Sequence, residues 1–207
     1  MKGSILSQLP RYDRFLGGKG TLEVGYPWLS VGAILALEGV IFRVDQAHQA
    51  PKRVLELGSG GSTVFFAKRA ESVLTVETDP TWAPLTLQAL ERHGVASKVF
   101  LQACTNAESE RYVNAQPNSS FDLMLVDHAA DHMVVGRGAR HAFSRLPLAL
   151  IALPKLRSTG WLVVDNYALH GMEAFDYTGW ETWVFDDMRY SGRGTLIARR
   201  RPGWARP

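Results

Sequence analysis

The sequence predicts a doubly wound α/β fold, with a seven-stranded, mostly parallel sheet, helices on both faces and a C-terminal antiparallel hairpin. Three observations lead to this prediction. β-prone runs alternate with helical patterns between residues 53 and 165. The run FDLMLVD at 121–127 is almost continuously apolar, as in a strand that is buried on both faces. The last two β-prone runs are separated by the turn-forming residues SGRG at 191–194.

The N-terminal part of the sequence is expected to contain a lead-in segment and one helix. Residues 1–26 are irregular and contain a glycine-rich stretch, while residues 27–207 are expected to form a single domain. Apolar residues recur with helical spacing from Trp28 to about Val44. Pro27 suits the first turn of such a helix.

The remaining elements follow from the same two periodicities. We expect seven strands, at residues 53–57, 72–78, 98–103, 121–127, 161–165, 182–185 and 195–198. We expect three further helices, at residues 62–70, 81–93 and 141–156. Gly94 is a suitable stop for the second of these helices, whereas Pro147 and Pro154 should break or bend the third.

Length and composition exclude several classes of protein. A chain of 207 residues with 46% hydrophobic and 21% charged residues can bury a core of its own. The single cysteine, Cys104, excludes a disulfide framework and a cysteine-rich zinc module. No apolar run is long enough for a signal-peptide core or a membrane span, so we expect a soluble, cytoplasmic protein with no membrane partner.

Positive charge is concentrated near the C-terminus. The formal net charge is +3, and Arg199-Arg200-Arg201 and Arg206 contribute to it. Such a tail can contact phosphate, but we expect a solvated chain end. No Asn-Pro-Pro-Tyr or Asp-Pro-Pro-Tyr motif follows the 121–127 strand, so nucleic acid is not the expected partner.

A glycine-rich turn, Gly58-Ser59-Gly60-Gly61-Ser62-Thr63, connects the strand at 53–57 to the next helix. Glycine permits a tight turn and a close approach of the main chain to a ligand, and a helix start offers free N–H groups. The following strand brings Glu77 to the same end of the sheet, where a carboxylate can bind both hydroxyls of a ribose. Together these features predict a nucleotide site.

Two residues bear on which nucleotide is bound. Thr63 stands where the dinucleotide fingerprint G-x-G-x-x-G requires its third glycine, and the lysine of a P-loop is absent. Glu56, two residues before the first glycine, can reach a cationic amino group, which a pyrophosphate ligand lacks. Thr63 therefore argues against a dinucleotide, and Glu56 favours a nucleotide that carries a cationic group.

Four segments, VLELGSGGST at 54–63, TVETD at 75–79, FDLMLVDH at 121–128 and WLVVDN at 161–166, resemble those of class I S-adenosylmethionine-dependent methyltransferases. The resemblance covers about residues 53–166, and the hairpin fits the sixth and seventh strands of that family. It implies S-adenosylmethionine as cofactor, with Glu56 near its methionine end. It further implies cofactor contacts from the glycine loop, the ribose-side residues and the adenine-side residues: Gly58, Ser59, Gly60, Gly61, Ser62, Glu77, Thr78, Cys104, Asp127 and His128.

A second constellation lies at the ends of two neighbouring strands. Asp127-His128 follows one of them and Asp165-Asn166 follows the other. Three oxygen ligands, two of them carboxylates, suit a hard cation such as magnesium. The arrangement resembles the metal site of catechol and caffeoyl-CoA type O-methyltransferases, which implies Asp127, Asp165 and Asn166 as metal ligands.

Two features differ from those enzymes. Ala130 stands where their catalytic lysine is found, and a Gly-Arg-Gly insertion at 136–138 lengthens the stretch between the two acids. The alternative is a metal-free cleft, in which Asp127, His128, Asp165 or His170 acts as a base or orients the acceptor. The insertion favours this alternative.

The expected function is transfer of a methyl group from S-adenosylmethionine to a hydroxyl of a small molecule or sugar. Two alternatives stay open. The first is a nicotinamide-dependent oxidoreductase, against which Thr63 argues. The second is a non-catalytic cofactor-binding or interaction protein: Glu56, Gly58, Gly60 and Glu77 argue against a lost cofactor site, whereas the absence of the lysine at Ala130 leaves this alternative open. Further candidates for the acceptor pocket are His132, His141, Tyr167 and Tyr177.

Overall fold

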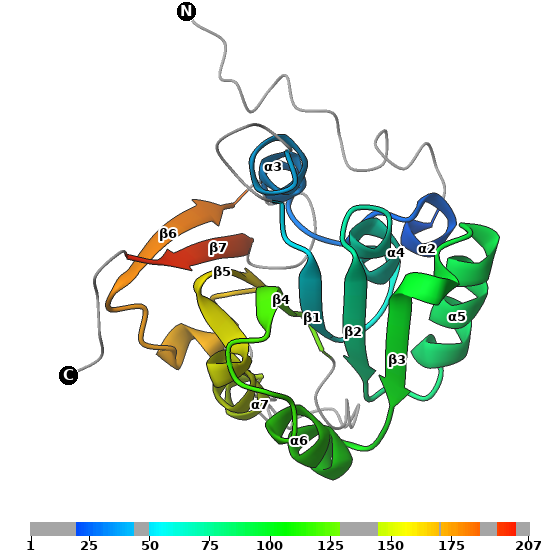
Figure 1. Cartoon of the computed structure of the whole chain (residues 1–207). Coiled ribbons are helices and arrows are strands. Elements are labelled where there is room, and N and C mark those ends of the chain that lie inside the picture. The colour runs from blue at the N-terminus through cyan, green and yellow to red at the C-terminus, as the bar shows by residue number, and fades with distance from the viewer. Residues whose placement is uncertain (1–19, 44–49, 129–144, 170, 187–193, 202–207) are drawn as a thin grey trace, which may run out of the picture.

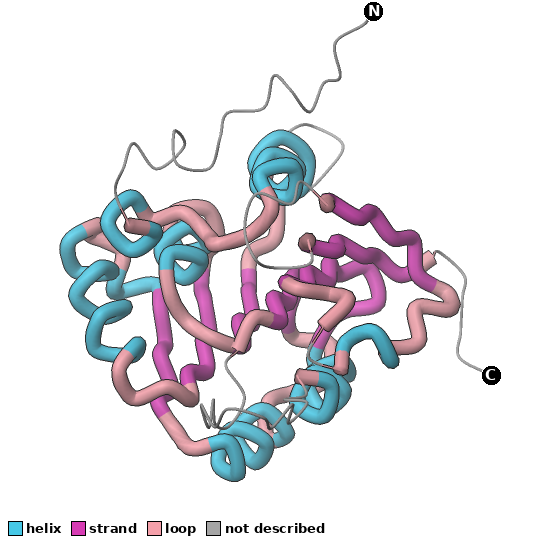
Figure 2. The backbone as a smooth tube through the Cα atoms, turned by 180° about the vertical axis from the view of Figure 1, so that it is seen from behind, coloured by secondary structure: helices cyan, strands magenta, loops and turns pink. Residues whose placement is uncertain are grey.

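A seven-stranded sheet with helices on both faces forms the centre of the molecule (Figures 1 and 2). The computed structural model describes residues 20–43, 50–128, 145–169, 171–186 and 194–201. The strands are β1 (Arg53–Leu57), β2 (Ser72–Glu77), β3 (Val99–Ala103), β4 (Phe121–Val126), β5 (Leu156–Asp165), β6 (Trp180–Phe185) and β7 (Thr195–Arg200). The longer helices are α2 (Thr21–Val24), α3 (Val31–Ala36), α4 (Gly61–Ala67), α5 (Trp82–Arg92), α6 (Asn106–Asn114) and α7 (Leu146–Ala152). The described residues also form one π turn, η2 (Leu37–Ile41), and three 3₁₀ turns, η3 (Ala96–Lys98), η4 (Leu153–Lys155) and η5 (Met172–Ala174).

The sheet has the order β3-β2-β1-β4-β5-β7-β6. The first five of these strands pair with one another in parallel, while β7 is antiparallel to both β5 and β6. The predicted α/β fold with its terminal hairpin is therefore confirmed. The direction in which the chain builds the sheet reverses between β1 and β4, and ligands bind such sheets at the carboxyl ends of the strands beside this point.

Alternate residues of the central strands serve two separate cores. Val54, Leu123 and Leu125 face α3, α4 and α5, whereas Leu55 and Met124 face α6 and α7. Every residue of these strands that is named here is at most 1% exposed. Burial on both faces explains why β1 and β4 are apolar almost throughout.

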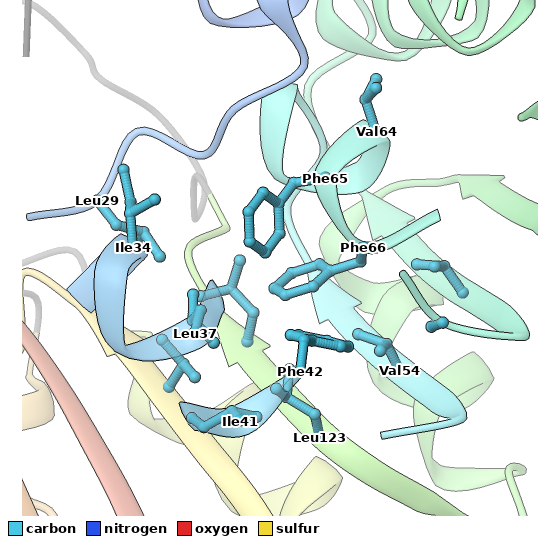
Figure 3. Close-up of a cluster of buried hydrophobic side chains, with 14 of the residues drawn as sticks. Leu29, Ile34, Leu37, Ile41, Phe42, Val54, Val64, Phe65, Phe66 and Leu123 are labelled. Atoms are coloured by element: carbon cyan, nitrogen blue, oxygen red, sulfur yellow. The ribbon is translucent and has the colours of Figure 1, made fainter. Parts of the chain in front are cut away.

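An aromatic cluster joins α4 to the end of η2 (Figure 3). Phe65 and Phe66 of α4 are fully buried, and their ring centroids lie 6.1 Å and 5.9 Å from that of Phe42. Leu37 and Ile41 complete the packing. Because these apolar side chains hold α4 rigidly over the sheet, the glycine loop that precedes α4 is also held in place.

The expected helix from Trp28 to Val44 is shorter and less regular than its pattern indicates. Helix α3 starts at Val31, because Ser30 is bound outside the helix, with its N–H on Thr195 Oγ1 and its hydroxyl on the Phe185 carbonyl. The helix then widens into the π turn η2. Pro27 therefore precedes the helix instead of opening it, and Val44 lies outside the described residues.

Helix α6 was not predicted, although the sequence carries a signal for it. Thr105 and Glu108 form a capping box, in which each side chain bonds the main-chain N–H of the other residue. The helix has few apolar residues, and only Ser109 and Val113 are buried. Because the apolar residues of this segment have little helical periodicity, the sequence pattern does not predict the helix.

The structure changes the predicted role of Pro147 in helix α7 and the predicted start of strand β5. Pro147 lies in the first turn of α7 and does not bend it, and Pro154 lies in the 3₁₀ turn that ends the helical segment. Residues 141–144 of the expected helix lie outside the described residues. Strand β5 begins at Leu156, five positions before the predicted start at 161, and pairs with β4 through a register shift.

The basic C-terminal residues are not simply a solvated chain end. Arg199 and Arg200 belong to β7, and their guanidinium carbons lie 5.0 Å from the ring centroids of Trp161 and Trp180. Arg201 is exposed, and Arg206 lies outside the described residues. Within the described ranges, none of the helices has the length and apolarity that crossing a lipid bilayer requires.

The N-terminal segment lies directly against the start of α4. A Cβ atom added at Gly61 would overlap the carbonyl oxygen of Tyr26 and lie 2.7 Å from that of Thr21. Only glycine permits this approach. The close packing therefore places the segment at 21–26 beside the glycine loop.

Replacing Gly61 by alanine should lower the free energy of unfolding by about 1–3 kcal/mol, the usual cost of overpacking. The measurement is urea denaturation, with Gly39→Ala as the matched control, because a Cβ at Gly39 meets nothing within 4 Å. Equal stability of the two variants would contradict the packing argument.

Candidate functional site

The glycine loop and the end of β4 are in main-chain contact. Gly58 has a φ of +92°, which only glycine adopts readily. A Cβ at this position would lie 2.7 Å from the Asp127 carbonyl oxygen and 2.8 Å from His128 Cα. The predicted cofactor loop and the predicted catalytic residues are thus parts of one site.

Glu56 lies beneath this loop and is fully buried. Its Oε2 accepts a hydrogen bond from the Thr63 hydroxyl at 2.7 Å, and the same hydroxyl accepts the Gly60 N–H at 2.9 Å. Thr63, which replaces the third glycine of a dinucleotide fingerprint, therefore ties the loop to the acid. This role of Thr63 was not predicted from the sequence.

The other oxygen of Glu56, Oε1, is buried and forms no hydrogen bond within the part of the chain that the structure describes. The pKa of Glu56 is raised to about 8, chiefly by burial and in smaller part by the charge of Asp127, against the lowering effect of the hydroxyls of Ser62, Thr63 and Thr75. A buried acceptor without a donor is costly. A ligand that brought a cationic donor to this oxygen would remove that cost, so the site fits a positively charged group.

Glu77 at the end of β2 is held in one orientation. Its Oε2 accepts the main-chain N–H and the hydroxyl of Ser59, at 2.7 Å and 2.6 Å, and its Oε1 accepts the Asp79 N–H at 2.8 Å. The Ser59 hydroxyl also contacts Thr86 at 3.0 Å. This carboxylate is therefore part of the loop's own framework as well as a candidate for ribose.

The β3 end supplies a cavity next to Glu77. Cys104 donates its N–H to the Glu77 carbonyl, and Thr78 is half-buried beside it. A cavity of about 390 Å³ opens here and is lined by Gln102, Ala103, Cys104, Glu108, Arg111 and Tyr112. Burial raises the pKa of the Cys104 thiol, which disfavours the reactive thiolate. Cys104 is thus a wall of the cavity, as its place in the sequence suggests.

The two acids at the ends of β4 and β5 differ in their surroundings. The Asp127 side chain is 27% exposed, whereas Asp165 is only 9% exposed. Thr195 donates to Asp165 Oδ1 at 3.2 Å, and the Asn166 amide donates to its Oδ2. Burial raises the pKa of each acid, the charge of Asp127 also raises that of Asp165, and nearby Arg145 opposes both shifts.

Arg145 also lies in this site, although the sequence does not indicate it. Its guanidinium donates to the carbonyl oxygens of His128 and Asp165, both at 2.9 Å, and forms an ion pair with Asp127 Oδ1 at 3.1 Å. Residue 145 is far from both strands in sequence, and no motif marks it. Only the fold brings it to the carboxyl ends of β4 and β5.

The expected magnesium ligands are therefore already engaged. Asp127 pairs with Arg145, and both carboxylate oxygens of Asp165 accept hydrogen bonds from protein groups. Among the described residues, no three His, Cys, Asp or Glu side chains are grouped as a metal site would need. This donor set does not fit a divalent cation.

The other candidates are only partly placed. His128 is buried, at 2% exposed. The Tyr167 hydroxyl lies 3.4 Å from both carboxylate oxygens of Asp186, and Tyr177 packs against Phe175 with a centroid distance of 4.6 Å. The other positions named from the sequence lie outside the described residues: Ala130, His132, the insertion at 136–138, His141 and His170.

Comparisons with solved structures cover almost the whole chain. The O-methyltransferase from Bacillus cereus, in complex with SAH, is 16% identical over 93% of this chain and 98% of its own, with a TM-score of 0.59. The O-methyltransferase TomG from Streptomyces achromogenes, involved in tomaymycin synthesis and in complex with SAM, is 16% identical over 97% and 91%, with a TM-score of 0.58. A methyltransferase from Geobacter sulfurreducens is 16% identical over 97% and 90%, with a TM-score of 0.54.

The chain has the class I methyltransferase fold. No family model and no curated protein matches the sequence. Within this methyltransferase fold, the loop after β1, Glu77 after β2 and the acids after β4 and β5 all lie at the carboxyl edge of the sheet, where ligands bind.

Replacing Glu56 by glutamine should flatten the dependence of stability on pH. Between pH 4.5 and about 8 the folded chain holds a proton on Glu56 that the unfolded chain has lost, so the free energy of unfolding falls as pH rises through this window. The variant should lose up to about 1.4 kcal/mol per pH unit of this slope. Urea denaturation without ligand, across the window, measures it.

The matched control is Glu71→Gln, because the Glu71 side chain is 68% exposed at the start of β2. Parallel pH curves for the wild type and Glu56→Gln would show that Glu56 is ionised in the folded protein.

Proposed function

We propose that this protein transfers a methyl group from S-adenosylmethionine to a hydroxyl of a small molecule. The observation that carries the proposal is the buried oxygen Glu56 Oε1, to which none of the described residues donates a hydrogen bond. S-adenosylmethionine brings an ammonium group and a sulfonium, whereas a dinucleotide brings an anionic pyrophosphate. An acid at this position favours the first ligand and opposes the second.

The cofactor would be held by residues of three strand ends. Glu56 would face the amino group at the methionine end, and the loop from Gly58 to Ser62 would pass beneath it. Glu77 would accept hydrogen bonds from the ribose, because Oε1 has one bonded N–H and retains acceptor capacity. Ala103, Cys104 and His128 would adjoin the adenine, next to the cavity at the β3 end.

The bound cofactor supplies a methyl group on a positively charged sulfur. In the transfer, the bond from that carbon to sulfur would break as a bond to the acceptor oxygen forms, S-adenosylhomocysteine would leave, and the acceptor's proton would pass to a base, for which Asp127 is the candidate. The protein's task is to hold the acceptor oxygen in line with the methyl group and to exclude water. Asp127 is the acid that can face the acceptor, because it is the more exposed of the two.

The choice of a hydroxyl acceptor is supported by the comparisons. Two of the similar structures are O-methyltransferases, although their identity to this chain is only 16%. No target-base motif follows β4, so a small molecule is favoured over nucleic acid.

Replacing Glu77 by alanine should weaken S-adenosylhomocysteine binding by about 1.5–3 kcal/mol, the range for hydrogen bonds to a charged group. Isothermal titration calorimetry measures the affinity. Glu71→Ala, an exposed acid at the other end of β2, serves as the control and should bind as the wild type does. Unchanged affinity in Glu77→Ala would remove Glu77 from the cofactor site.

S-adenosylhomocysteine should raise the melting temperature of the wild type more than NAD or NADP at the same concentration. A ligand that binds only the folded state stabilises it by mass action. Differential scanning fluorimetry compares the three ligands. A larger shift with NAD or NADP would support the oxidoreductase alternative, and no shift with any of them would contradict the proposed function.

A further inference from the structure

Arg145 occupies the place between the ends of β4 and β5 where the acid pair would otherwise hold a cation. Its side chain is only 9% exposed. The guanidinium contacts main chain at His128, Asp165 and, at 3.4 Å, Asp127. The ion pair to Asp127 Oδ1 adds a fourth contact from the same group. This set of contacts joins the two strand ends through one side chain.

Arg145 brings to the acid pair the positive charge that a divalent cation would bring, through its ion pair with the Asp127 carboxylate and its bond to the main-chain carbonyl of Asp165. Two nearby carboxylates repel each other unless a positive charge lies close to them. Magnesium would meet this need with oxygen ligands only. A guanidinium meets it with a permanent charge and a rigid set of donors, and it cannot be released by a chelator.

The remaining oxygens of the site point to the same conclusion. Asp165 Oδ1 is bonded by Thr195, whose own hydroxyl also accepts the Ser30 N–H at 3.0 Å. Asp165 Oδ2 is bonded by Asn166. A metal bound to these two carboxylates would have to compete with Arg145 for Asp127 and with the hydrogen bonds on Asp165.

We propose that Arg145 replaces a divalent cation at this edge of the sheet, so that the chain excludes metal from the acid pair and Arg145 positions Asp127 beside the cofactor site. Positioning for methyl transfer rests on the proposed function. The exclusion of metal does not, because it depends only on the contacts of Arg145.

The first test is Mn²⁺ binding to the wild-type protein, measured by electron paramagnetic resonance of free Mn²⁺ with and without S-adenosylhomocysteine. We expect no Mn²⁺ to bind at millimolar concentration. One bound Mn²⁺ per chain that disappears in Asp127→Asn would overturn the proposal. This arm needs no variant of Arg145 and no acceptor.

The second test removes the guanidinium. Arg145→Met should bind Mn²⁺ at least about tenfold more tightly than the wild type, because the acid pair then lacks its cation. Arg145→Lys should stay close to the wild type, because it keeps the charge. Arg157→Met is the matched control, since Arg157 pairs with Asp122 at the far end of β4. A purely structural Arg145 would lower stability in Arg145→Met without creating Mn²⁺ affinity, and that outcome would also overturn the proposal.

The variants can be separated from unfolding and from the proposed function. Circular dichroism establishes whether Arg145→Met folds, and the wild-type measurement stands if it does not. Calorimetry with S-adenosylhomocysteine on the wild type tests the cofactor independently. Absence of cofactor binding would contradict the proposed function, whereas Mn²⁺ binding to the wild type would contradict the role of Arg145.

Discussion

The close approach of Gly58 to the main chain of Asp127 and His128 is the constraint on which the site depends. Without a side chain at Gly58, the loop after β1 lies against the end of β4, and the cofactor loop and the acid pair become one surface. Further contacts extend outwards from this point: Ser59 fastens Glu77 of β2 to the loop, and Arg145 fastens the end of β5 to that of β4. The carboxyl ends of β2, β1, β4 and β5 are thus linked by side chains as well as by the sheet.

Buried carboxyl groups give this edge of the sheet its chemical character. Glu56, Asp127 and Asp165 lie close enough for Asp127 to raise the pKa of the other two acids. Burial of several acids without enough positive charge is unfavourable, and proteins retain such an arrangement where a ligand or an ion pair compensates it. Arg145 compensates one side of the site, while Glu56 Oε1 beneath the glycine loop has no donor among the described residues. This asymmetry is the physical basis for proposing a cationic cofactor at Glu56 and no metal at Asp127.

Much of the fold could be predicted because its signals are local. The apolar runs of β1 and β4, the glycine turn at 58–61 and the hairpin of β6 and β7 all follow from periodicity and turn chemistry. Helix α6 could not be found in this way, because a helix with one apolar and one small polar buried residue has almost no periodicity. The start of α3 was missed for another reason: Ser30 is bound by residues more than 150 positions away, which no local pattern contains.

The sequence by itself determined the α/β class, the position of the glycine loop and the acids at the carboxyl ends of β1, β2, β4 and β5, since each depends on residues that are adjacent in the chain. The tertiary structure alone decided what those acids contact. Thr63 bonds Glu56 because one turn of α4 returns over the end of β1, and Arg145 meets Asp127 and Asp165 because α7 begins beside two parallel strand ends. Hydrogen bonds and ion pairs act over a few ångströms. Which distant residues come within that range is settled only when the whole sheet has formed.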